Sequence, residues 1–195
     1  KFKQIIKNKL KNSQVNLHFN TQLKKSQVNN YDKIIICTYS ANNRILNDLS
    51  KIKKSKKNRY ELIEKIVVKL PKKYRNKSYV IIDGKFVCLD PYLGTNYHLL
   101  SDVKYSKIEV IKKNNPIFKS VKKKYLNDKI NKNLKISNFR KFIKHSSHYL
   151  PFLKDAKYIG SMFIVRALKL NVEKTDERTG EIQKINKKFI SVFSG

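Results

Sequence analysis

The sequence predicts an α+β fold whose centre is an antiparallel sheet with one or two packing helices. Three observations support this prediction. Residues 60–100 contain four short runs of β-branched, aromatic and aliphatic residues, each typical of a strand. Turn-forming residues bound these runs, which is the pattern of an antiparallel meander. The segments with helical periodicity lie outside this stretch. The four runs are residues 63–70, 79–82, 86–89 and 97–100.

A hairpin is predicted at the dipeptide Asp83-Gly84. Asp-Gly between two apolar runs favours a type I′ turn, because that turn needs positive φ at both central residues. We therefore expect Val80–Ile82 to pair with Phe86–Cys88 across this turn.

The segments before the sheet are predicted to be one helix and three strands. Residues 1–12 place four apolar side chains near one helical face, which suits a crossover helix and a charged surface helix equally well. Residues 15–19 alternate as a strand does, and residues 22–28 are expected to form a weaker strand. The apolar run Tyr31–Thr38 is typical of a strand buried on both faces of a parallel or mixed sheet.

A second helix is predicted at Asn42–Leu49. Ser40 stands where it can cap this helix, since a serine oxygen accepts a hydrogen bond from the first turn. A contact with a cofactor is the alternative for Ser40. Residues 50–59 are a charge run, which favours a solvated connector.

After the meander, a strand is expected at residues 101–113. Residues 117–135 are rich in lysine and fit either a helix or an insert. Ser137-Asn138 precedes a predicted helix from Phe139 to His148, which Pro151 ends. The remaining prediction is a strand at 158–170, a polar turn at 173–181, and a final strand at 182–193 that forms a hairpin with the strand before it.

The charge is strongly basic. Lys and Arg total 45 against 14 Asp and Glu, which gives a formal net charge of +31. One interpretation is a nucleic-acid-binding module, because a basic surface attracts phosphate backbones. The other is biased composition: six arginines leave 39 lysines spread along the chain, whereas specific readers of nucleic acid rely on arginine. We expect no specific nucleic acid partner.

The cysteines indicate the cellular compartment, and the lengths of the apolar runs indicate whether the sequence can span a membrane. Cys37 and Cys88 lie in apolar runs, which predicts buried free thiols and a cytoplasmic protein. No run approaches the roughly 18 apolar residues that span a membrane. The chain begins with Lys1 and ends at Gly195 after an apolar run, so we expect a fragment truncated at both ends.

The order of these features resembles FAD-dependent oxidoreductases of the D-amino-acid oxidase and glycine oxidase class, over most of the chain. The resemblance rests on Tyr31–Thr38, the meander, Leu150-Pro151 before a strand with Arg166, and Phe189–Gly195. It implies three parts. Residues 1–59 would be the remnant of a Rossmann-like FAD-binding domain, 60–170 an antiparallel substrate domain, and 171–195 a hairpin strand returning toward the FAD domain.

The resemblance also implies a function. The chain would be a fragment, inactive alone, of an enzyme that oxidises an amino acid, an amine or a similar small substrate by hydride transfer to FAD. Its cofactor contacts would be Thr38, Tyr39, Ser40 and Gly195. A basic nucleic-acid-binding module without catalysis is the alternative function.

Four residues are candidates for substrate binding. The resemblance implies that Arg166 clamps a substrate carboxylate, and that Tyr92 and Tyr97 face the flavin and substrate. For Arg166 the alternatives are a structural ion pair or an exposed strand position, because a charge in an apolar strand needs a partner or water. Tyrosines are enriched in any strand. His98 fits a general base or a half-buried strand residue.

The sequence shows no motif for phosphoryl transfer, hydrolysis or zinc chemistry. His145 and His148 stand three residues apart on a predicted helix, a spacing that can bind metal. With no Cys, Asp or Glu close in sequence to complete a site, we predict no metal.

Overall fold

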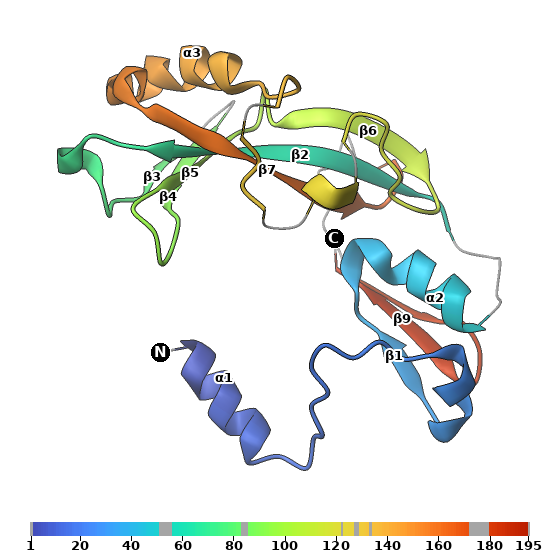
Figure 1. Cartoon of the computed structure of the whole chain (residues 1–195). Coiled ribbons are helices and arrows are strands. Elements are labelled where there is room, and N and C mark those ends of the chain that lie inside the picture. Colours follow the sequence, from blue (N-terminus) through green and yellow to red (C-terminus); the bar gives the residue numbers. More distant parts are fainter. Residues whose placement is uncertain are drawn as a thin grey trace.

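The computed structural model describes residues 2–50, 56–82, 86–121, 123–126, 129–132, 134–171 and 180–194. Within them the strands form two sheets (Figure 1), and the predicted α+β fold is confirmed. The helices are α1 (Phe2–Lys11), α2 (Asn42–Ser50) and α3 (Phe139–Tyr149). The strands are β1 (Ile34–Ile36), β2 (Asn58–Lys69), β3 (Tyr79–Ile81), β4 (Val87–Pro91), β5 (His98–Asp102), β6 (Lys107–Lys113), β7 (Lys157–Leu168), β8 (Glu181–Lys184) and β9 (Phe189–Phe193).

Strand β2 is the centre of the larger sheet. It pairs antiparallel with β7 from Arg59 to Lys69. Its other edge is shared between two strands, β6 along the first half and β5 along the second. Strands β4 and β3 continue the sheet beyond β5. Because β2 has neighbours on both edges and packing on both faces, most of its side chains are buried, including charged ones.

One face of the larger sheet carries the main core. Successive side chains of a strand point to opposite faces, so Leu62, Ile66 and Val68 share one face. Helix α3 covers part of this face and inserts the fully buried Phe142 (Figure 1). Farther along, Leu62 belongs to a second apolar cluster that reaches Phe193 of β9. The same face therefore also joins the larger sheet to the smaller one.

The predicted hairpin is confirmed in its strands. Val80 of β3 lies opposite Cys88 of β4, and Ile81 lies opposite Val87. The turn dipeptide Asp83-Gly84 lies outside the described residues.

The smaller sheet combines distant parts of the chain. Strand β1 pairs in parallel with β9, and β8 pairs antiparallel with β9. Helix α2 packs on this sheet through Leu46 and Leu49. The prediction of one final strand paired with 158–170 is wrong. Asn186 interrupts it, since its side-chain oxygen accepts the N–H groups of Lys188 and Phe189 and forms a turn between β8 and β9.

Four local predictions in the first 40 residues are also wrong. No strand forms at residues 15–19 or 22–28, which are largely exposed, and a 3₁₀ helix spans Lys25–Asn30 instead. Strand β1 is buried on one face only, because Ile35 is exposed. Cys37 is exposed rather than buried, while Cys88 is half-buried, and both are free thiols.

The described part of the lysine-rich segment 117–135 packs along the outer edge of β7. Asn131 exchanges backbone hydrogen bonds with Ser161. Gly160 permits this approach, because a Cβ there would lie 2.7 Å from Cγ2 of Ile130 and 2.8 Å from the carbonyl oxygen of Asn131. A 3₁₀ turn at Lys123–Tyr125 is the helical element of this segment within the described residues.

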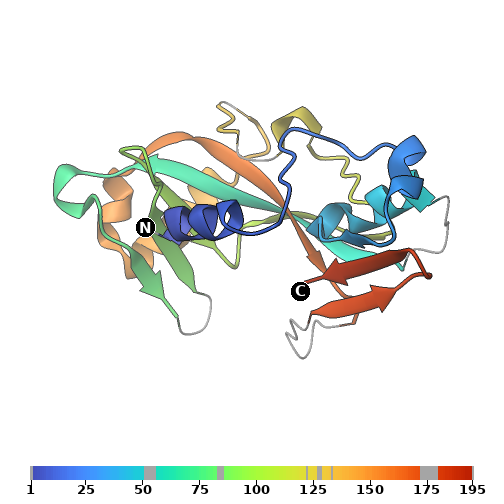
Figure 2. The same cartoon turned by 90° about the horizontal axis from the view of Figure 1, so that it is seen from below.

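Helix α1 lies apart from both sheets, below the larger one (Figures 1 and 2). Its apolar residues Phe2, Ile5 and Ile6 are exposed. None of the helices in the described ranges combines the length and the apolar character that a membrane span needs.

Asp102 fixes α3 to the sheet. Its carboxylate is buried at the end of β5. One oxygen accepts the N–H groups of Lys104 and Tyr105 at 2.8 and 3.2 Å, and the other lies 2.6 Å from Nδ1 of His145 and accepts a hydrogen bond from Ser146. A buried carboxylate is tolerated only with such partners.

We expect Asp102→Ala to lower the free energy of unfolding by about 3 kcal/mol, because it leaves four buried or half-buried donors without their acceptor. Urea titration followed by circular dichroism measures this change. Asp90→Ala is the matched control, since Asp90 is an exposed carboxylate on the neighbouring strand. Equal effects of the two substitutions would show that the Asp102 network contributes little.

Candidate functional site

The carboxyl ends of β1 and β9 meet at one edge of the smaller sheet, because the two strands are parallel. Thr38, Tyr39 and Ser40 follow β1 at this edge. Tyr39 has φ of 53°, a left-handed conformation that is uncommon for a bulky residue and concentrates at functional sites. The sequence singled out these three residues as cofactor contacts, and the structure brings them together at the end of a parallel strand pair.

Tyr39 joins this edge to the larger sheet. Its ring stacks on Phe193 of β9 with 5.9 Å between ring centroids. Its hydroxyl donates to the carbonyl of Ala167 at 3.1 Å and accepts the N–H of the same residue at 3.0 Å. Ala167 directly follows Arg166 on β7. Tyr39 contacts the backbone of Ala167, and its ring packs in the apolar cluster on the face opposite the Arg166–Glu61 pair. The contact therefore joins the loop to β7 rather than to the guanidinium.

Asn42 holds the loop in place from the start of α2. Its buried side-chain oxygen accepts hydrogen bonds from the N–H and the hydroxyl of Thr38, at 2.6 and 3.0 Å. Its amide nitrogen donates to the carbonyl of Val192 at 2.7 Å and to the hydroxyl of Ser191 at 3.2 Å. This one side chain ties β1, α2 and β9 together. Ser40 lies in a 3₁₀ turn before α2.

A cavity of about 420 Å³ lies against β1 and α2, and Thr38 is one of its lining residues. Its lining is mostly apolar, with Arg44 and Asp48 of α2 as charged groups. A volume of this order suits part of a cofactor or a small ligand.

Arg166 is paired with a buried carboxylate. Its Nε donates to one oxygen of Glu61 at 2.9 Å, and its Nη2 donates to the same oxygen. Nη2 of Arg59 lies 2.7 Å from the other carboxylate oxygen of Glu61, and Nζ of Lys107 lies 3.9 Å from that same oxygen. Glu61 is fully buried, whereas the side chains of Arg166 and Lys107 are 36% and 40% exposed. The ion pair considered from the sequence is present, and more than a third of the Arg166 side chain still reaches solvent.

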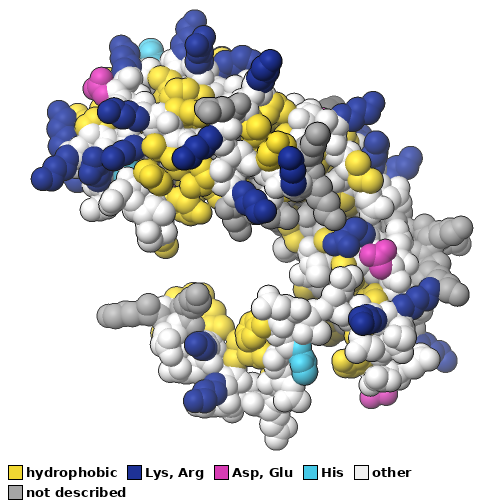
Figure 3. Space-filling model, viewed as in Figure 1, with side chains coloured by type: hydrophobic (Ala, Val, Ile, Leu, Met, Phe, Trp, Pro, Cys, Tyr) yellow, Lys and Arg dark blue, Asp and Glu magenta, His cyan; other side chains and the backbone are white. Residues whose placement is uncertain are grey.

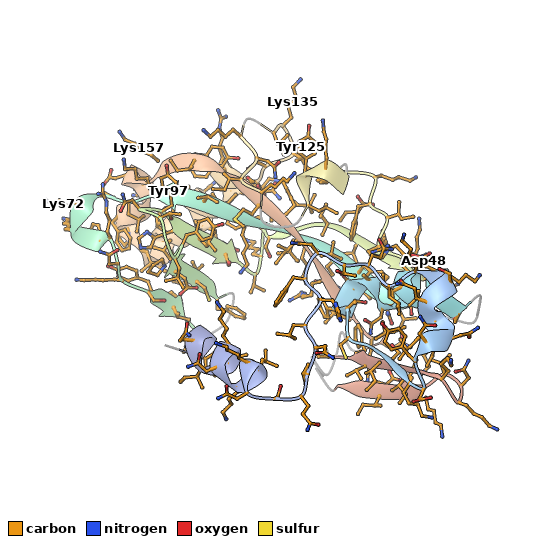
Figure 4. All side chains as sticks on the ribbon, turned by 60° about the horizontal axis from the view of Figure 1, so that its bottom comes forward. Asp48, Lys72, Tyr97, Tyr125, Lys135 and Lys157 are labelled. Carbon is orange, nitrogen blue, oxygen red and sulfur yellow. The ribbon has the colours of Figure 1, made fainter. Side chains whose placement is uncertain are left out.

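The structure does not bring the other substrate-binding candidates to Arg166. His98 lies opposite Val68, whereas Arg166 lies opposite Glu61. Seven residues along a strand correspond to about 23 Å. Tyr92 and Tyr97 close the turn between β4 and β5 and lie farther out still, as Figure 4 shows for Tyr97 at the opposite end from Asp48 of α2. The four residues do not form one small-substrate site.

His98 and Cys88 are poorly suited to acid–base or nucleophilic chemistry. Burial lowers the pKa of His98, although the Lys77 backbone and Asp90 oppose this shift, so burial favours the neutral imidazole. Its two ring nitrogens have no hydrogen-bond partner among the described residues. Burial and Asp90 raise the pKa of the Cys88 thiol, which disfavours the reactive thiolate.

Two other sequence predictions concern cofactor and metal contacts. Gly195 lies outside the described residues. His145 turns toward Asp102 rather than toward a shared site with His148. Over the described ranges, no three or more His, Cys, Asp and Glu side chains gather in an arrangement that could hold a metal ion.

Sequence reasoning missed Glu61, Lys107 and Asn42. Glu61 carried a usable signal, since a carboxylate inside the apolar run of β2 needs a cationic partner just as Arg166 needs an anionic one. Lys107 is one of 39 lysines and Asn42 is one of many asparagines, so neither stands out in the sequence.

No protein-family model, curated protein or solved structure matches this chain. The resemblance drawn from the order of its sequence features therefore stays a prediction.

Lysine and arginine are scattered over the face drawn in Figure 3 and do not form one stripe. With a net charge of +31, we expect the protein to bind duplex DNA weakly and without sequence preference. Fluorescence anisotropy with two unrelated duplexes should show affinity falling steeply between about 50 and 200 mM salt. Retained affinity for one sequence at the higher salt would instead support a nucleic-acid-binding module.

We expect Tyr39→Phe to lower the free energy of unfolding by about 1–2 kcal/mol, because it removes both hydrogen bonds to the Ala167 backbone. Chemical denaturation measures the loss. Tyr31→Phe is the control, as Tyr31 is exposed and precedes the same strand. If the two variants are equally stable, the Tyr39 hydroxyl does not join the two sheets energetically.

Proposed function

We propose that this chain is part of an FAD-dependent oxidoreductase that oxidises an amino acid, an amine or a similar small substrate by hydride transfer to flavin. One observation carries the proposal. Tyr39 hydrogen-bonds to the residue after Arg166, which joins the carboxyl-terminal edge of a parallel strand pair to the strand that bears an accessible guanidinium.

Parallel strands support the cofactor half of this proposal. In open α/β sheets, ligands bind outside the carboxyl ends of the strands, where loops with free backbone groups can approach them. Thr38, Tyr39 and Ser40 occupy that position after β1, and the chain after Phe193 leaves β9 at the same edge. The left-handed conformation of Tyr39 further suits a loop shaped for a ligand.

The guanidinium supports the substrate half. A flavin takes up the hydride, so the protein must mainly hold the substrate in position. Arginine suits this task because its fixed donor geometry matches a carboxylate. A small substrate held by Arg166 is too far away to contact Tyr92, Tyr97 or His98, which lie beside the other end of β2. The proposal therefore rests on Arg166.

The test uses the complete gene product that contains this chain. We expect it to purify with FAD or to bind added FAD, and an amino-acid or amine substrate to bleach the flavin absorbance without oxygen. A protein that takes up no flavin under any condition would overturn the proposal.

We expect Arg166→Lys in the same gene product to raise KM for an amino-acid substrate about 10- to 100-fold, since lysine cannot reproduce the bidentate contact. Steady-state kinetics measure this change. Arg140→Lys on the exposed surface of α3 is the control and should leave KM unchanged. An unaltered KM in Arg166→Lys would remove the carboxylate-binding role while leaving the flavin chemistry open.

A further inference from the structure

The cluster around Glu61 holds more positive than negative charge. Glu61 is the central carboxylate, and it contacts Arg166 of β7 on one side and Lys107 of β6 on the other. The two positive charges of Arg166 and Lys107 already exceed the single negative charge of Glu61, and this holds whether or not the charge of Arg59 is counted. The side chains of both cations are partly exposed, whereas Glu61 is 1% exposed. The excess positive charge is therefore the part of the cluster that a ligand can reach.

Glu61 uses only part of the hydrogen-bonding capacity of Arg166. A guanidinium has five N–H donors. Glu61 takes one from Nε and one from Nη2, which is the side-on pair. The end-on pair, one N–H each from Nη1 and Nη2, remains, and in the described part of the chain no group accepts from it. A second carboxylate fits this pair with bidentate geometry.

Lys107 supplies the second contact. It reaches Glu61 from the opposite edge of β2, at 3.9 Å from the oxygen that Arg166 does not use. The two cationic groups thus flank one carboxylate and lie close enough for a short dicarboxylate to meet both. An ammonium at 3.9 Å holds Glu61 loosely and can turn toward an incoming anion.

We propose that Arg166 and Lys107 bind the two carboxylates of a short dicarboxylic ligand, with Glu61 as the positioning residue that orients Arg166. If Arg166 also serves the proposed oxidation, the substrate is an acidic amino acid. That last step rests on the proposed function, whereas binding of the dicarboxylate does not.

Calorimetric titration at about 0.15 M salt tests the site, since that salt suppresses long-range attraction by the basic surface. The probes are succinate, acetate and inorganic phosphate. We expect succinate to bind about three- to fivefold more tightly than acetate or phosphate, because the added contact with Lys107 is a partly exposed ion pair. Equal affinities for the three probes would reduce the cluster to a general anion attractor and overturn the proposal.

Variants locate the contacts. Lys107→Gln should weaken succinate about three- to fivefold, the range of a partly exposed ion pair, and leave acetate unchanged. Arg166→Lys should weaken both ligands about tenfold or more. Lys113→Gln is the matched control: it lies on the same strand, but opposite Asn58, so it points to the other face of the sheet. Equal losses from Lys107→Gln and Lys113→Gln would contradict the site.

Separate measurements distinguish a failure of the dicarboxylate site from a misfolded variant and from a failure of the proposed oxidoreductase. Circular dichroism identifies a variant that fails to fold. If Arg166→Lys fails to fold, the partly exposed Lys107→Gln still tests the site. Succinate binding by a protein that takes up no flavin would refute the oxidoreductase and leave the dicarboxylate site standing. Reduction of flavin by neutral and acidic amino acids at equal rates would support the oxidoreductase and refute the assignment of an acidic amino acid as its substrate.

Discussion

The structure depends on the burial of two carboxylates on opposite faces of β2. Glu61 and Glu64 are both fully buried within a strand that pairs along both edges. A buried carboxylate is destabilising unless cations or hydrogen-bond donors surround it, so each glutamate dictates what packs beside it. Glu61 gathers Arg166, Arg59 and Lys107 on one face. Glu64 accepts the N–H of Asn138 and the hydroxyl of Ser161 on the other.

The partners of Glu64 place α3. Asn138 immediately precedes the helix, where free N–H groups and the helix dipole favour a negative charge. Asp102 then holds the last turns of the helix through His145 and Ser146. Two buried carboxylates from different strands thus fix both ends of α3, and the apolar contacts of Phe142 fill the space between them. Electrostatics sets the position of the helix, and packing contributes most of the free energy.

Because lysine is in such excess, each of the few acidic residues matters for the electrostatic energy of the folded chain. At a net charge of +31 the folded chain repels itself, and each carboxylate that neutralises a cation reduces this cost. Among the acidic residues that the structure describes, Glu61, Glu64 and Asp102 are nevertheless buried rather than spread over the surface. They act as structural anchors, and Glu61 leaves surplus positive charge beside it. The basic composition and the proposed anion site are in this way connected.

The sequence by itself determined the elements that depend on local periodicity and turn chemistry. The strands of the β3–β4 hairpin, the strand that bears Arg166, and helices α1, α2 and α3 all appear where apolar spacing predicted them. Tertiary structure alone decided which distant segments meet. The pairing of β1 with β9, across more than 150 residues, depends on the Asn186 turn and the Asn42 side chain. Whether Arg166 would find an anion or water was likewise open, because Glu61 lies 105 residues earlier in the chain. Spacing along a chain encodes faces and turns, whereas contacts of this range depend on how the whole sheet closes.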